Sequence, residues 1–66
     1  MLLDKSSVYT YKEFYVYQAR DENGNLAGKL VCIKGKTRLE LHISPGETIS
    51  NTVHAIEAAV DKFLKG

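Results

Sequence analysis

Residues 8–20 read VYTYKEFYVYQAR. Aromatic and β-branched residues dominate this segment, which favours a β-strand. Its four tyrosines all occupy odd-numbered positions: Tyr9, Tyr11, Tyr15 and Tyr17. Because successive side chains of a strand point to opposite faces, an unbroken strand would carry all four rings on one side. The other side would carry Phe14 and Val16, so both faces of this strand are apolar.

The length of this expected strand raises a question about its continuity. Thirteen residues are long for a strand, since about 5 or 6 are usual. A bulge or break at Lys12-Glu13 would shift the alternation, and the first two tyrosines would no longer share a face with the last two. The sequence leaves the two arrangements open, and we expect the tyrosines on the side that the rest of the fold leaves uncovered.

The turn after this strand contains Asn23-Gly24, the strongest short-range signal for a hairpin. A two-residue turn at Asn23-Gly24 and a three-residue bulged turn over residues 22–24 both fit. The two turns pair the strands in registers that differ by one residue. Each would therefore direct a different face of the first strand toward the core. The second strand is expected at about 26–34, and it turns at Lys34-Gly35-Lys36 into a third strand at about 37–44.

The third strand alternates between apolar and polar residues, which indicates one buried face and one wet face. The segment from Ser44 to Glu47 fits either a type II turn centred on Pro45 and Gly46 or a capping box with Ser44 as the N-cap. Both precede a helix at about 48–65, which Gly66 would cap. Its apolar residues recur at spacings of four and three, as on one helical face: Ile49, Val53, Ile56, Val60 and Phe63.

These elements predict an α+β fold in one small domain over residues 1–66. A three-stranded antiparallel β-meander is followed by one C-terminal amphipathic helix that packs on one sheet face, in the order β-β-β-α. A chain of 66 residues is near the lower limit at which one hydrophobic core suffices. Help from a partner or from oligomerisation is therefore plausible.

The first hairpin is apolar on both faces, and one helix covers only one of them. A contiguous apolar patch usually marks an interaction site, and a second copy related by a two-fold axis is a common partner. We therefore expect a homodimer, formed sheet to sheet or edge to edge, and a protein partner on the uncovered face with its tyrosines. In the alternative, Leu2, Leu3 and a bent first strand fold over that face and close a monomeric core.

Positive charge gathers in the second hairpin. Between residues 29 and 38 there are four basic residues and no acidic one: Lys29, Lys34, Lys36 and Arg38. Such residues commonly protect an exposed turn and edge. Together with tyrosines for base stacking they also permit a second hypothesis, binding of nucleic acid through phosphate contacts. The near-neutral net charge of +1 argues against that hypothesis, because nucleic-acid-binding domains are usually basic.

Catalytic and metal-binding patterns are missing from the sequence. His42, His54 and Cys32 are the only imidazoles and thiol, and their spacing matches neither a catalytic constellation nor a zinc site. The glycines form neither a dinucleotide fingerprint nor a P-loop. We therefore predict a protein that is not an enzyme and uses no metal or cofactor. With one cysteine and no long apolar run, a cytoplasmic location without membrane insertion is expected.

Overall fold

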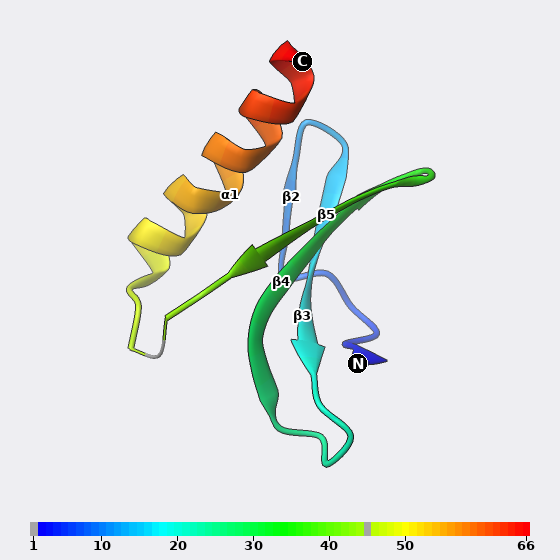
Figure 1. Cartoon of the computed structure of the whole chain (residues 1–66), viewed down its shortest axis with the longest axis vertical. Coiled ribbons are helices and arrows are strands. Elements are labelled where there is room, and N and C mark those ends of the chain that lie inside the picture. The colour runs from blue at the N-terminus through cyan, green and yellow to red at the C-terminus, as the bar shows by residue number, and fades with distance from the viewer. Residues whose placement is uncertain (1, 45) are drawn as a thin grey trace.

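The computed structural model describes residues 2–44 and 46–66. Within them the chain forms five strands and one helix: β1 (Leu2–Leu3), β2 (Tyr9–Tyr11), β3 (Phe14–Arg20), β4 (Leu26–Lys34), β5 (Thr37–His42) and α1 (Ile49–Lys65). All strand pairs are antiparallel, and α1 lies along one side of the sheet (Figure 1). The α+β class and the β3-β4-β5 meander with a C-terminal helix are confirmed.

The segment expected as one strand is a hairpin. The chain reverses at Lys12 and Glu13, so that Tyr11 lies opposite Phe14 in the ladder between β2 and β3. Both turn residues have positive φ, 48° and 72°, as a two-residue type I′ turn requires. The prediction of a single strand over residues 8–20 is therefore wrong, and the break considered at this point is a complete reversal.

Both β1 and β2 pair with β3, at opposite ends of it. In β1, Leu3 lies opposite Ala19, and in β2, Tyr9 lies opposite Val16. The sheet order is β1-β3-β4-β5, with β2 beside β3 as well. The N-terminal leucines thus extend the edge of the sheet, whereas the monomeric alternative had expected them to fold over its face.

The turn between β3 and β4 is the three-residue form. Asp21 N donates to Asn25 O (2.8 Å), and Gly24 N donates to Asp21 O (3.0 Å). Gly24 has a φ of 84°, the left-handed conformation that closes such a turn. The β3–β4 register shifts once between Gln18 and Arg20, and beyond this shift Phe14 and Val16 of β3 face the core.

The connection from β5 to α1 is a turn followed by a separate cap. Glu47 N donates to Ser44 O (3.2 Å), and Gly46 has a φ of 80°, as the third residue of a type II turn requires. Pro45, the other central residue of the predicted turn, lies outside the described residues. The N-cap is Thr48, whose hydroxyl accepts from Asn51 N (3.1 Å), so the capping-box prediction with Ser44 as N-cap is wrong.

The hydrophobic core lies between α1 and the sheet. Six buried side chains form it: Phe14, Val16, Leu30, Cys32, Ile56 and Val60. The ring of Phe14 also meets that of Phe63 edge to face, with centroids 6.0 Å apart. In the predicted apolar stripe of α1, Ile56 and Val60 are fully buried, whereas Ile49 in the first turn is 84% exposed.

Candidate interaction surfaces

The reversal between β2 and β3 divides the four tyrosines between the two faces of the sheet. Directly opposed residues of an antiparallel pair share a face, so Tyr9 and Tyr11 lie on the same face as the core residues of β3. Both rings pack against the core. The expectation that all four tyrosines lie on the uncovered face is therefore wrong for Tyr9 and Tyr11, and it holds for Tyr15 and Tyr17.

Polar contacts join the hidden tyrosines to the helix. The hydroxyl of Tyr9 donates to Glu57 Oε2 (3.2 Å), and the hydroxyl of Tyr11 donates to Asp61 Oδ1 (3.1 Å). Lys12 Nζ reaches the same Asp61 oxygen at 2.7 Å. These contacts fix β2 against the C-terminal half of α1, and they give these tyrosines a structural role in the fold.

The contacts shift the ionisation of the groups involved. The hydrogen bond from Lys12 lowers the pKa of Asp61 below its ordinary 3.8, and the Tyr11 hydroxyl acts in the same direction. The same hydrogen bond raises the pKa of Lys12 above 10.5. Partial burial, followed by the Glu57 carboxylate, raises the pKa of Tyr9 above 10.0. Water screens the Lys12–Asp61 pair, since both side chains are about half exposed.

Asp61→Asn is expected to lower the unfolding temperature at neutral pH and to have little effect in acid. A carboxylate whose pKa is depressed by folding stabilises the fold above its ordinary pKa, and this contribution disappears as the pH falls through the folded-state value. For Asp61 the loss begins near 3.8 and continues below it. Thermal unfolding followed by circular dichroism, from about pH 2 to 7, measures the difference from wild type.

Glu22→Gln is the matched control, because Glu22 lies exposed in the β3–β4 turn. It should follow the wild-type curve across the whole range. A deficit of Asp61→Asn that persisted unchanged in acid would show that the amide disturbs packing and that the charge is unimportant.

The sheet face opposite α1 is here called the open face. Its side chains alternate along the strands with those that face the helix: Thr10, Tyr15, Tyr17, Val31, Ile33, Arg38 and Glu40. One cross-strand row joins Tyr15 to Ile33 and Arg38, and the next joins Tyr17 to Val31 and Glu40. The tyrosines of β3 thus lie beside aliphatic and charged residues of the meander.

Exposure differs between these two rows. Tyr15 is 52% exposed, Ile33 is half-buried and Arg38 is exposed. Val31, between Tyr17 and Glu40 across the strands, is fully buried on this face. The exposed apolar part of the open face is therefore centred on the Tyr15 row and is smaller than the sequence suggested.

The four basic residues of the second hairpin do not form one patch. Lys29 Nζ lies 3.9 Å from Glu40 on the open face. Lys34 Nζ lies 3.6 Å from Glu13 and 5.9 Å from the ring centre of Phe14, on the helix side. Lys36 is in the β4–β5 turn, which projects away from α1 (Figure 1). Only Arg38 combines an exposed side chain with a place in the Tyr15 row.

The residues considered for catalysis lie apart in the fold. Cys32 is buried in the core, and burial raises the pKa of its thiol, which disfavours the reactive thiolate. His42 is exposed at the end of β5, and His54 is exposed on α1. Across residues 2–44 and 46–66, no group of three or more His, Cys, Asp or Glu side chains could hold a metal ion. In the same residues, no helix has the length and apolar character needed to cross a membrane.

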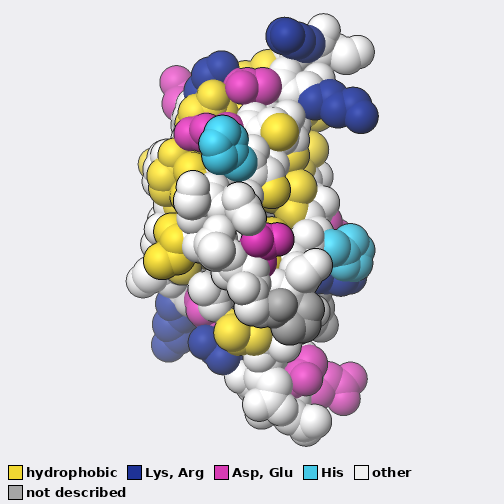
Figure 2. All heavy atoms as spheres, turned by 90° about the vertical axis from the view of Figure 1, so that its left-hand side faces the viewer, with side chains coloured by type: hydrophobic (Ala, Val, Ile, Leu, Met, Phe, Trp, Pro, Cys, Tyr) yellow, Lys and Arg dark blue, Asp and Glu magenta, His cyan; other side chains and the backbone are white. Residues whose placement is uncertain are grey.

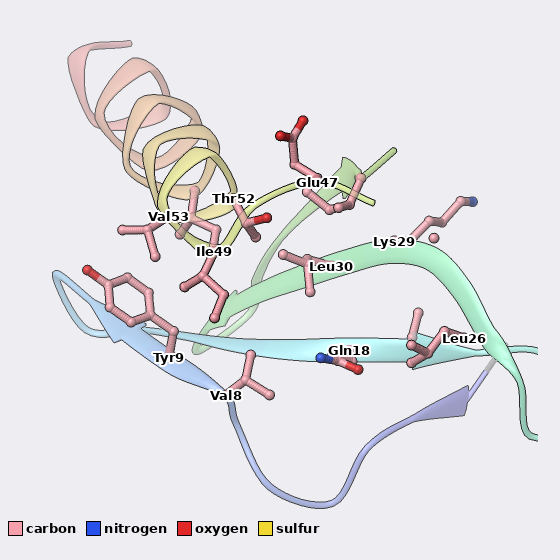
Figure 3. A pocket seen from close by; sticks show the side chains of 14 residues that line it. Val8, Tyr9, Gln18, Leu26, Lys29, Leu30, Glu47, Ile49, Thr52 and Val53 are labelled. Carbon is pink, nitrogen blue, oxygen red and sulfur yellow. The ribbon is translucent and has the colours of Figure 1, made fainter. Parts of the chain in front are cut away.

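An apolar groove lies between the start of α1 and the sheet, with a volume of about 370 Å³. Figure 3 shows Ile49 and Val53 of α1 on one side of it, with Leu30 of β4 and Val8 on the other. Leu26 (60% exposed) and Val8 (53% exposed) leave its rim open to water. In Figure 2, seen from the helix side, apolar side chains reach the surface between charged ones. No sequence pattern indicates this groove, because its lining comes from separate segments that only the tertiary fold brings together.

The chain matches no protein-family model, and comparison with curated proteins and with solved structures found no match.

Proposed function

We propose that this chain is a small non-catalytic interaction module that assembles as a homodimer and binds a protein partner through the open face. The proposal rests on the row formed by Tyr15, Ile33 and Arg38. This row lies on the face opposite α1, and the ring of Tyr15 is half exposed there. Tyrosine and arginine are enriched among the residues that dominate binding energy in protein interfaces. A half-buried aliphatic side chain beside them supplies apolar area that a partner would remove from water.

The charges on this surface favour a protein over a nucleic acid. Glu40 lies on the open face and pairs with Lys29, and on the helix side Glu13 pairs with Lys34. Two of the four cations available for phosphates therefore have carboxylate neighbours. A partner that presents both apolar and charged groups complements this mixed surface better than a uniformly negative backbone does.

Two variant baits test the proposal, one altered on the open face and the other on α1. Tyr15→Ser removes the exposed ring, and Leu64→Ser removes an apolar side chain of similar exposure from α1, 48% against 52%. Proteins from the source cell that bind the wild type and the Leu64→Ser bait should be depleted at least tenfold on the Tyr15→Ser bait. The same proteins bound equally to all three baits would contradict the proposal.

Nucleic-acid binding is the second candidate, because Arg38 lies in the Tyr15 row and Lys36 follows in the adjacent turn. It predicts that the wild type binds single-stranded oligonucleotides with an affinity that falls steeply as salt rises. Lys36→Ala should then flatten the salt dependence, and Tyr15→Ser should weaken binding without changing the slope. An absence of binding at low salt removes this candidate.

A further inference from the structure

The outer edge of β5 is a strand edge that the described residues do not pair. β5 is the last strand of the sheet and pairs only with β4. Ile43 N donates to Gly28 O (2.8 Å) on the β4 side. Because backbone groups of an antiparallel strand alternate in direction, those of Leu39 and Leu41 also point to β4. The N–H and C=O groups of Arg38, Glu40 and His42 therefore point outward.

A second copy of the chain is the partner whose geometry this edge constrains most. Two identical antiparallel strands that join edge to edge are related by a two-fold axis perpendicular to the sheet. Opposed residues then share a face, so open-face residues meet open-face residues. The outward backbone groups of one β5 also meet the outward groups of the other, which permits only registers that differ by steps of two residues.

Charge distinguishes these registers. With the axis at Arg38, two arginines would be opposed, and with the axis at Glu40, two glutamates would be opposed, both of which are unfavourable. With the axis at Leu41, Glu40 would lie opposite His42, and Arg38 would lie opposite Ser44 without an acidic partner. With the axis at Leu39, Arg38 of each copy lies opposite Glu40 of the other. That register forms two ion pairs between copies on the open face, and it brings the two half-buried Leu39 side chains together on the helix face.

We infer that two copies of this chain pair through their β5 strands, antiparallel and centred on Leu39, with reciprocal contacts between Arg38 and Glu40. The inference rests on the homodimeric part of the proposed function and does not depend on partner binding. The two sheets then form one continuous sheet, with both helices on one side and both open faces on the other. The two Tyr15 rows lie on the same surface, and Arg38, which ends each row, lies next to the axis.

Charge reversal on the dimer tests the register. Sedimentation equilibrium of the wild type should give 14.8 kDa, twice the 7.4 kDa of one chain. Arg38→Glu and Glu40→Arg each replace two attractive contacts by two repulsive ones, so each should raise the dissociation constant at least tenfold. The double variant R38E/E40R exchanges the charges and should return it to within about threefold of wild type, as expected for a directly coupled pair.

Lys29→Met is the matched control, because it breaks the Lys29–Glu40 contact within one chain and leaves the edge unchanged. It should leave the dissociation constant as it is, and circular dichroism should show that all variants are folded. An Arg38→Glu variant that still dimerises as the wild type, or a double variant as weak as the single ones, overturns the Leu39-centred register.

Two other results separate this inference from the proposed function. If Tyr15→Ser yields monomers while Arg38→Glu does not, the copies associate through their open faces and the edge pairing is wrong. If the wild type stays a monomer at hundreds of micromolar, both the edge pairing and the homodimer fail. Partner capture through Tyr15 is measured separately and can still succeed or fail in that case.

Discussion

Phe14→Ala is expected to lower the free energy of unfolding by about 3–5 kcal/mol, the usual loss when a buried phenylalanine is truncated. Phe14 is fully buried, and its ring packs edge to face with Phe63. A domain of this size has a total stability of only about 3–10 kcal/mol. The variant should therefore be largely unfolded or unfold at a much lower urea concentration, which urea titration followed by circular dichroism measures.

Tyr15→Ala is the matched control, since Tyr15 is the next residue along β3 but lies on the open face and is 52% exposed. This substitution should lower the free energy of unfolding by no more than about 1 kcal/mol, the range of cross-strand side-chain pairs. Equal losses from the two truncations would contradict the assignment of Phe14 to the core and of Tyr15 to the open face.

Val60→Asp should lower the free energy of unfolding at least as much as Phe14→Ala does. An unpaired buried charge costs about 3–5 kcal/mol. Val60 is fully buried in the face of α1 that packs on the sheet. The carboxylate has to ionise without a partner there or force the helix away from the sheet. Thermal unfolding at neutral pH should lose its cooperative transition, and near-ultraviolet dichroism of the tyrosines should weaken as α1 separates from β2.

Ala58→Asp places the same charge two residues earlier, on the exposed side of α1. Only the lower helix propensity of aspartate should matter there, about 0.7 kcal/mol. A comparably large effect at Ala58 would mean that helix propensity and not burial limits the stability of α1.

The helix and the meander could be predicted because periodicity and turn residues agree in those segments. Leu39 and Leu41 alternate with charged residues along β5, and this pattern has one buried face as its simplest solution. In α1 the repeat of three and four residues identifies Ile56 and Val60, which the structure buries. Periodicity alone does not ensure burial: Ile49, at the first turn of the helix, fits the pattern and is nevertheless exposed.

The split of residues 8–20 into β2 and β3 could not be predicted in full, because Lys12 and Glu13 carry no turn signature. Two-residue type I′ turns favour asparagine, aspartate and glycine, which tolerate positive φ. A lysine and a glutamate adopt it here where contacts from α1, among them that between Lys12 and Asp61, hold the hairpin. Tertiary contacts override local preference at this turn, and no short-range pattern records them.

The division of the candidate surface follows from the same turn. In an unbroken strand over residues 8–20 the four tyrosines would share one face. In the structure the chain reverses, and Tyr9 and Tyr11 lie on the helix face. The neighbours of Val31 on the open face are known only once the register is known. Surface position could therefore be predicted for Tyr15 and Tyr17 only on the condition that the register was right.

The contact between β2 and α1 also means that the β2–β3 hairpin can be completed only after α1 has been synthesised. The left-handed turn at Lys12 and Glu13 costs about 1–2 kcal/mol per residue, and the contacts with Glu57 and Asp61 oppose this cost. Fifty residues separate Tyr11 from Asp61, and at about 5–20 residues per second a ribosome needs about 2.5–10 s to add them. For that interval the nascent hairpin has no helix to close upon. The first hairpin to be made is thus among the last parts of the fold to be completed.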